Sequence, residues 1–324
     1  LNTYLFLLGA FVEPKTIFGI CSLVGSLVRK TIVKTRRNYG HYVGVVAAIA
    51  IFVVYVYGLT FGFSQIRVRH ITLNVSNLPK NFDGYRIVQV SDMHIGTFNG
   101  WRRFILEHEM DSIKHQNANL IVFTGDLQNM RPSEILPFTN LLKTSMKNAI
   151  AVRGNHDYTE YVKLNPKEAE QQNNDFANIV RHKLGWNLLE NNHITIKRGN
   201  DSIVIAGTEN DGKPPFPQKA NYQKVLQGVA KGAFVIMLQH DPSAWRRHIL
   251  PKNIAQITLC GHTHGGQMQF FGFRPTEIRE ENDYGVYRSG NHFLNVTDGL
   301  GGFAPFRVNM PNEIVVITLK AKTT

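Results

Sequence analysis

The sequence predicts a membrane segment followed by a large α/β domain. Residues 42–63 contain no charged side chain, and from about residue 65 short apolar runs alternate with amphipathic segments. Several of these runs end in clusters of Asp, Asn or His. The chain has 324 residues, of which 43% are hydrophobic and 19% charged, so it is long enough for one large domain and an additional region.

The uncharged run extends over about 22 positions, which at about 1.5 Å per residue spans a bilayer core of roughly 30 Å. No polar stripe marks a face exposed to water, which argues against a buried helix of a soluble domain. We therefore expect a membrane-anchoring region at residues 1–64 with a transmembrane helix at about 42–63. Two further apolar stretches, 1–12 and 16–28, leave the number of spanning helices open.

Basic residues flank this helix unequally. Arg67 and Arg69 follow it, whereas the preceding cluster contains Arg29, Lys30, Lys34, Arg36 and Arg37. The larger cluster is expected to stay in the cytoplasm, which places the C-terminal domain outside it; the cluster could also bind anionic lipid. The net charge of +12 suits phosphates, acidic lipids or nucleic acid, or serves solubility alone.

Residues 65–324 form the second predicted domain. Alternating or continuous apolar runs predict strands at 67–75, 85–90, 120–124, 149–152, 201–207, 233–238 and 257–259. Helices are predicted at 101–115, 133–144 and 165–184, the last with Pro166 in its first turn and Gly185 after its end. The Gly- and aromatic-rich segment 268–319 predicts short strands of a further sheet layer. Within it, Phe270, Phe271 and Phe273 could hold an acyl chain, but we favour packing in the core.

Four motifs follow predicted strands. They read SDMHIG (91–96), GDL (125–127), GNHD (154–157) and GHTHGGQ (261–267). Functional groups gather at the carboxyl ends of strands in open sheets. Carboxylate, carboxamide and imidazole together suit Mn, Fe, Zn or Ni, whereas Ca prefers oxygen ligands alone. The motifs therefore predict a site for two metal ions about 3.5–4 Å apart, bridged by a carboxylate.

The order of these motifs resembles the calcineurin-like metallophosphoesterase superfamily over residues 65–320. The GHTHGGQ form behind a membrane segment is similar to its bacterial membrane-associated YkuE-type branch. The resemblance implies a four-layer α/β/β/α sandwich of two mixed sheets. It also implies a hydrolase in which metal-bound hydroxide attacks a phosphate ester or pyrophosphate.

The resemblance implies seven ligands for two divalent or trivalent ions, of Mn, Fe or Zn. The implied ligands are Asp92, His94 and His264 for the first ion, Asn155, His240 and His262 for the second, and Asp126 between the two.

Three further residues receive implied roles. His156 would contact the phosphate or protonate the leaving oxygen, and Asp157 would orient His156. Arg307 resembles a family arginine near the site, so a phosphate contact and a structural salt bridge are both open. The chain departs from the family pattern G-D-x-x-D at Asn129, where the last Asp is replaced. This change affects a supporting position and leaves the implied ligands intact.

The expected partners are a membrane and a phosphorylated small molecule or lipid, at a bacterial cell membrane with the catalytic domain outside the cytoplasm. A metal-dependent nuclease or nucleotide phosphodiesterase is the first alternative. We do not expect nucleic acid, because the basic residues are scattered and no aromatic-interleaved groove is evident. A non-catalytic, metal-bound membrane scaffold is the second alternative, against which the complete ligand set argues. The sequence leaves the substrate, monoester or diester preference, the physiological metals, protein partners and oligomeric state open.

Overall fold

The computed structural model describes residues 2–322 and contains two compact units. One consists of Leu1–Ser64 together with Ala304–Asn309, and the other of Gln65–Phe303 together with Met310–Thr324. Each unit has its own packing.

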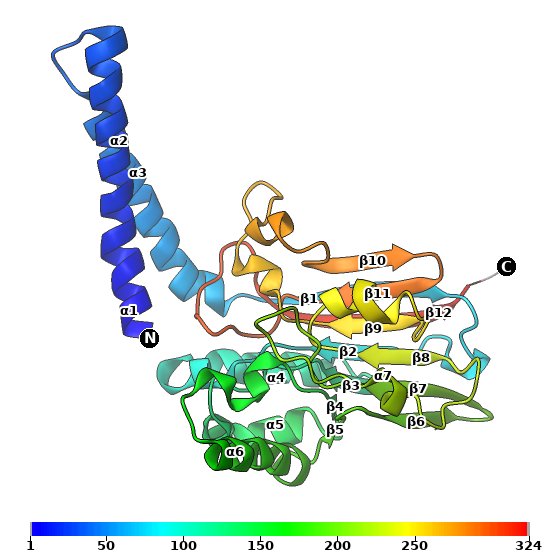
Figure 1. Cartoon of the computed structure of the whole chain (residues 1–324). Helices are drawn as coiled ribbons and strands as arrows, with labels where there is room; N and C mark the ends of the chain where they lie inside the picture. The colour runs from blue at the N-terminus through cyan, green and yellow to red at the C-terminus, as the bar shows by residue number, and fades with distance from the viewer. Residues whose placement is uncertain (1, 323–324) are drawn as a thin grey trace. The chain divides into compact units, whose positions relative to one another are not determined.

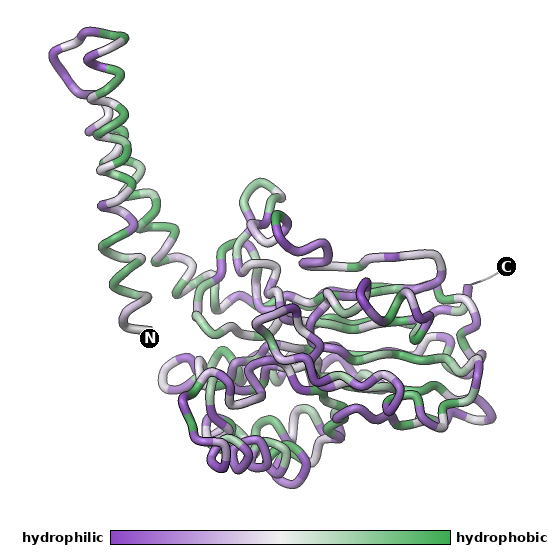
Figure 2. The backbone as a smooth tube through the Cα atoms, viewed as in Figure 1, coloured by the Kyte–Doolittle hydropathy of each residue, from purple (hydrophilic) through white to green (hydrophobic). Residues whose placement is uncertain are grey.

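The first unit is built on apolar helices. Their bounds are α1 (Asn2–Leu7), α2 (Glu13–Val28) and α3 (Tyr39–Tyr57). Helical turns continue beyond these bounds, so Leu8–Val33 (26 residues) and Tyr39–Gly62 (24 residues) are each long and apolar enough to cross a membrane. Figure 2 shows the turn between them as hydrophilic and much of both helices as hydrophobic. The apolar helix predicted at 42–63 is thus present, and a second candidate span precedes it, which suggests membrane association.

Close contact between α2 and α3 depends on glycine. A Cβ at Gly25 would lie 2.5 Å from the Cα of Gly40, and one at Gly44 would lie 3.1 Å from the carbonyl oxygen of Phe18. Small residues at such crossings let two backbones approach within van der Waals contact, which is how helices associate in lipid.

The segment 304–309 packs against the end of the second apolar helix. The Arg307 N–H donates to the carbonyl of Gly58 at 3.0 Å, and the ring of Phe306 stacks on Tyr55 with centroids 5.7 Å apart. A Cβ at Gly62 would lie 1.9 Å from the carbonyl oxygen of Arg307, so this approach also requires glycine. The chain thus returns to its second apolar helix more than 240 residues after leaving it.

The second unit contains two six-stranded mixed sheets (Figure 1). In sheet order, the first comprises β1 (Ile66–Val75), β12 (Asn312–Ala321), β2 (Arg86–Val90), β3 (Leu120–Phe123), β4 (Ile150–Ala151) and β5 (Asn187–Leu188). The second comprises β10 (Gly285–Ser289), β11 (His292–Val296), β9 (Ile257–Cys260), β8 (Val235–Leu238), β7 (Asp201–Gly207) and β6 (Asn192–Arg198). Most neighbouring strands are parallel; β12–β2, β10–β11 and β6–β7 are antiparallel.

Apolar layers hold the sheets and helices together. Ile87 and Val122 of the first sheet share one buried cluster with Ile205, Ile236 and Leu259 of the second. Figure 1 shows α4 (Arg103–His115), α5 (Thr139–Ser145) and α6 (Pro166–Asn178) grouped together next to the strands. On the outer face of the second sheet, a separate cluster includes Trp245 and part of the short α7 (Tyr222–Val225). The prediction of two mixed sheets covered by helices is confirmed.

The sequence predicted that the segment 268–319 forms a further sheet layer. In the structure its strands are divided between the two sheets. Strands β10 and β11 extend the second sheet, whereas β12 enters the first sheet between β1 and β2. Residues Ile314, Val315, Val316 and Ile317 of β12 are all buried. A strand that is apolar on both faces needs a central place in a covered sheet, and this explains its position.

A buried carboxylate ties β1 and β12 to the second sheet. Glu313 accepts hydrogen bonds from Arg67 (3.1 Å), Arg69 (2.9 Å) and the hydroxyls of Tyr284 (2.7 Å) and Thr297 (3.0 Å). Burial alone would raise the pKa of Glu313, but the two guanidinium groups hold it below its ordinary value. This contribution to stability is therefore present above about pH 4.5 and is lost as the pH falls through the lowered pKa.

We expect Glu313→Gln to lower the free energy of unfolding at pH 7 by about 3 kcal/mol, because two arginines lose their buried partner. The substitution should also weaken the acid dependence of unfolding. Denaturant unfolding of the detergent-solubilised chain at pH 7 and pH 4 measures both effects. Glu107→Gln, which removes an exposed pair with Arg103, is the control and should cost less than about 1 kcal/mol. Equal losses in the two variants would contradict the role of Glu313.

Candidate metal centre

The seven expected ligands lie on loops that follow strands β2, β3, β4, β8 and β9. Five of them have a left-handed backbone, with φ values of 50° at Asp92, 45° at His94, 61° at Asp126, 76° at His262 and 52° at His264. Residues other than Gly adopt this conformation infrequently, Asn, Asp and His more often than the rest, and it concentrates at functional sites. The loops therefore bear local strain where the ligand side chains converge.

Glycines of the motifs allow the loops to approach. A Cβ at Gly154 would lie 2.2 Å from the Oδ1 of Asp126, and one at Gly261 would lie 2.1 Å from the Oδ2 of Asp92. A side chain at either position would displace a carboxylate. The glycines of GNHD and GHTH are therefore required because no larger residue leaves room for these carboxylates.

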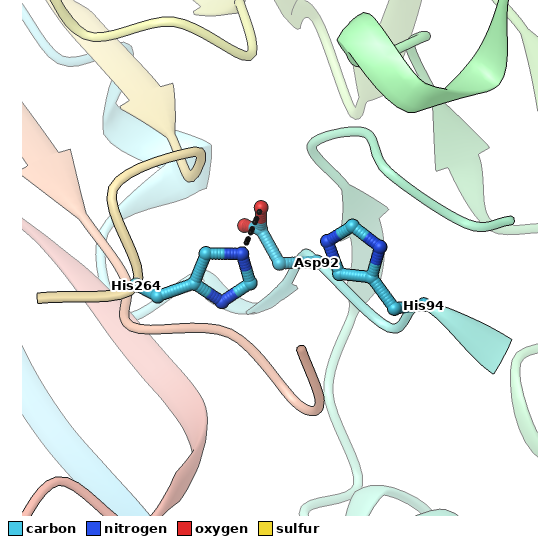
Figure 3. Close-up of side chains that lie close together, drawn as sticks. All are labelled: Asp92, His94 and His264. Atoms are coloured by element: carbon cyan, nitrogen blue, oxygen red, sulfur yellow. Dashed lines mark ion pairs between the residues drawn. The ribbon is translucent and has the colours of Figure 1, made fainter. Parts of the chain in front are cut away.

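One ligand cluster consists of Asp92, His94 and His264 (Figure 3). Their ligand atoms lie within 4.8 Å of one another, and the Nε2 of His264 is 3.5 Å from the Oδ1 of Asp92. The His94 and His264 rings stack with centroids 5.2 Å apart. One carboxylate and two imidazoles are a donor set for a transition metal or zinc.

A second cluster consists of Asp126, His240 and His262, whose ligand atoms also lie within 4.8 Å of one another. The Oδ1 of Asn155 is 3.1 Å from the Nε2 of His240 and 2.8 Å from the Nδ1 of His262. The Nδ1 of His240 lies 2.7 Å from the carbonyl oxygen of Thr124. Because a carbonyl only accepts, this Nδ1 carries a proton, and Nε2 is left to bind a metal.

Asp126 belongs to the second cluster and also lies close to the first. Its Oδ2 is 3.6 Å from the Nε2 of His94 and 3.2 Å from the Nε2 of His240. Burial alone would raise its pKa, but His240, His156 and His94 hold the pKa of Asp126 well below its ordinary value. Burial opposes a charge on His240, yet Asp126 and Asp92 raise the pKa of His240 to about 10. The buried carboxylates thus require positive charge, and the donor set fits metal ions that would supply it.

His156 lies at the edge of this centre. Its backbone N–H donates to the Oδ1 of Asp126 at 2.8 Å, and its Nδ1 lies 2.7 Å from the carbonyl oxygen of Asn129. The Nδ1 is therefore a donor, and the ring is fixed by backbone. His156 also forms a third possible ligand group with His94 and Asp126. The position suits a phosphate contact and also permits metal binding, so its role stays a prediction.

The structure corrects the expected partner of Asp157. Its carboxylate accepts hydrogen bonds from the backbone N–H groups of Asp126 (2.8 Å), Leu127 (2.8 Å), Gln128 (3.1 Å) and Gly154 (3.0 Å). Burial and the Asp126 carboxylate raise the pKa of Asp157 to about 7, against the effect of these donors. Asp157 therefore fixes the turn that carries Asp126, while the carbonyl of Asn129 contacts the His156 ring.

Tyr161 and Phe303 border the centre without any signal in the sequence. The Tyr161 ring stacks on His156 with centroids 4.1 Å apart and an angle of 3°, and its hydroxyl accepts from the Nδ2 of Asn155 at 2.6 Å. Phe303 lies 5.3 Å from His156 and 6.3 Å from His94. Arg307, by contrast, is fully buried in the first unit, and its contact with a substrate stays a prediction.

We expect Tyr161→Phe to weaken metal binding at the second cluster by roughly tenfold, because the Asn155 amide loses the partner that orients it. Stacking on His156 is retained, so kcat at saturating metal should change little. Activity measured against metal concentration gives both values. Tyr287→Phe, which removes a hydroxyl contact with Asp283, is the matched control. An unchanged metal dependence in Tyr161→Phe would show that the tyrosine hydroxyl does not orient Asn155.

Comparison with known proteins decides the family. Residues 85–266, more than half of the chain, match the family described as Calcineurin-like phosphoesterase. The chain belongs to this calcineurin-like phosphoesterase family. An uncharacterized metallophosphoesterase of Aquifex aeolicus is 30% identical over 263 residues, which is 79% of this chain and 93% of that protein. The family predicted from the motifs is confirmed, and the chain is a metallophosphoesterase.

Two more relatives of this phosphoesterase are informative. The uncharacterized metallophosphoesterase YkuE of Bacillus subtilis is 28% identical over 267 residues, covering 77% of this chain and 84% of that protein. The UDP-2,3-diacylglucosamine pyrophosphatase LpxG of Chlamydia trachomatis is 25% identical over 302 residues, covering 74% and 86%. The similarity thus extends through most of both chains.

Proposed function

We propose that this metallophosphoesterase is a membrane-anchored hydrolase with two metal ions that cleaves a phosphate ester or pyrophosphate of a lipid-linked or envelope compound. The observation that carries the proposal is that Asp126, a member of the second cluster of ligand-type side chains, also lies close to His94 of the first. Both clusters are mostly buried, so a cation there would be shielded from bulk water. Electrostatic interactions are stronger in such a buried site than in water.

The ligands would divide as the resemblance implies. Asp92, His94 and His264 would hold one ion, and Asn155, His240 and His262 the other, with Asp126 shared. When bound, two such ions would make water nucleophilic at neutral pH and neutralise charge on phosphoryl oxygens. Mn, Fe and Zn suit this mixture of carboxylate, carboxamide and imidazole.

The side chains of the protein supply the remaining steps. The Nδ1 of His156 is held by the Asn129 carbonyl, so its Nε2 would contact a phosphoryl oxygen or give a proton to the leaving oxygen. Tyr161, stacked on the same ring, would keep its plane fixed. Asp157 would hold the turn of Asp126, so that the shared carboxylate does not rotate away during turnover.

Membrane anchoring supports a substrate in or beside a bilayer. Two candidate spans joined by a basic turn favour a hairpin with Arg29–Arg37 in the cytoplasm and the catalytic domain outside it. A tethered enzyme meets a membrane-bound substrate at a high effective concentration. The relative LpxG is named as a pyrophosphatase of UDP-2,3-diacylglucosamine, a diacylated sugar nucleotide. This name supports the same class of substrate for the present chain.

Hydrolysis assays of the full chain in nanodiscs test the proposal. The chain is loaded with Mn, Zn or Fe and assayed with p-nitrophenyl phosphate, bis-p-nitrophenyl phosphate and a nucleoside diphosphate linked to a diacylated sugar. We expect metal-dependent turnover, with the lipid-linked compound preferred over both soluble esters. Metal-dependent turnover restricted to the soluble esters would reject the lipid-linked substrate, and no turnover at two bound ions per chain would favour a scaffold.

A further inference from the structure

A short hairpin of aromatic residues follows the GHTHGGQ loop. Phe270 and Phe273 pair through two backbone hydrogen bonds, each 2.9 Å, so that Phe271 and Gly272 alone form the turn. The phenylalanines were expected in the core, yet Phe271 is fully exposed, and Phe270 and Phe273 are 40% and 48% exposed. The expectation was wrong, because the three side chains lie on a short exposed hairpin and not in the core.

The backbone of this turn is costly for its sequence. Both turn residues have a positive φ, 51° at Phe271 and 88° at Gly272. Two-residue hairpins of this kind favour Asn-Gly, because a bulky aromatic residue is strained in the left-handed region. Strain of this sort is retained where the residue has a use. An aromatic ring at the tip, exposed to water and strained, indicates a contact outside the domain.

The base of the hairpin is firmly held. Arg274 donates two hydrogen bonds to the carboxylate of Asp283, at 2.7 and 3.2 Å, and Thr276 donates to the same group at 3.0 Å. The side chain of Gln269 bonds the carbonyl of Gly272 across the turn at 3.2 Å. Ile278, 77% exposed, adds a further apolar side chain just beyond this base. The apolar tip is therefore presented on a rigid support, with His264 only six positions before Phe270.

We propose that this aromatic tip, defined as Phe270, Phe271, Phe273 and Ile278, inserts into the interfacial region of the lipid bilayer. Clustered exposed apolar side chains mark contact surfaces, and Phe with Leu-like residues partitions into the boundary between headgroups and acyl chains. The same chain has two helices able to cross a membrane, so a bilayer is the surface that lies within reach. Acidic and basic residues alternate beside the tip, as in Arg279 and Glu280, so the contact is apolar and does not require anionic lipid.

Insertion would hold the metal centre at the membrane surface, facing substrates that remain embedded by their acyl chains. The inference depends on membrane anchoring and not on hydrolysis. A failure of catalysis would therefore leave it standing, and a failure of insertion would leave the metal centre as proposed.

Fluorescence of single labelled cysteines in the full chain tests the insertion. Cys260 is fully buried, and Cys21→Ser removes the other thiol. An environment-sensitive probe is placed at Phe271→Cys or, as control, at Lys231→Cys, in the exposed turn before β8 and thus at the strand end away from the metal centre. Each chain is reconstituted singly in phosphatidylcholine nanodiscs.

We expect the probe at 271 to emit at shorter wavelength, to be quenched by doxyl-labelled lipid several-fold more than the probe at 231, and to be protected from iodide. Equal iodide accessibility at the two positions overturns the proposal. Protection from iodide without quenching by doxyl lipid overturns it as well, because the tip would then be covered by protein.

A second pair of chains removes the contribution of the probe itself. The label is placed at Ile278→Cys, with Phe271 intact or changed to Asn, a residue that tolerates positive φ. The Phe271→Asn chain should fold with equal or greater thermal stability and lose most of the quenching by doxyl lipid. Quenching that persists in Phe271→Asn would show that the aromatic ring does not insert.

Discussion

Asp126→Asn is expected to lower kcat for phosphoester hydrolysis on the order of 10³-fold, with little loss of folded protein. The carboxamide has the same shape but no charge, so the two cation sites lose the anion between them. It must also replace the oxygen that accepts the His156 N–H at 2.8 Å. Metal content by elemental analysis and kcat at saturating metal are measured on the same preparation, and both should fall.

The matched control is Asp111→Asn, at an exposed residue paired with Lys114 on helix α4. It should keep wild-type kcat and metal content. Near-normal turnover by Asp126→Asn, with two ions still bound per chain, would show that Asp126 is not a ligand shared by the two ions.

His156→Ala is expected to lower kcat by about 10²–10⁴-fold, the range for loss of a positioned proton donor or acceptor. Metal content should remain that of the wild type, because the seven expected ligands are all retained. A substrate with a leaving group of low pKa, such as p-nitrophenol, needs less protonation and should lose less activity than an alkyl phosphate. This comparison separates proton donation from simple phosphate binding.

His182→Ala changes an exposed histidine and should leave turnover intact. If His156→Ala instead loses one ion, His156 is a ligand in the group that it forms with His94 and Asp126. The proposed division of roles would then be wrong at this residue, while the two-ion centre would stand.

Much of the convergence of the expected ligands was predictable because each of them follows a strand closely. Asp92, Asp126 and His240 are within two or three residues of a strand end, and parallel strands bring such positions to one edge. The family match confirms the motifs as those of a phosphoesterase. The strand predicted at 149–152 contains the two-residue β4, whereas the two-residue β5 was not predicted, because it has too few positions for periodicity to distinguish it from a loop.

Contacts made in three dimensions were not predictable. Nothing in the spacing of Tyr161 or Phe303 indicates that both rings would lie against His156. The partner of Asp157 was mistaken because neighbouring residues in a sharp turn can face opposite ways, and backbone N–H groups compete for a buried carboxylate. The exposed tip at Phe271 was missed because composition favours burial of phenylalanine, whereas the left-handed turn determines its direction.

The return of segment 304–309 to the second apolar helix has a consequence for where this chain can be cut. Phe306 rests on Tyr55, and the Arg307 backbone fills the space above Gly62, while Phe303, one residue before the segment, borders His94 and His156. A protease cutting after Ser64 would separate residues 304–309 from the helix against which they pack. The released piece would carry an apolar loop that has lost its partner helix, so residues 1–64 and 304–309 are better kept together in any truncated form of the protein.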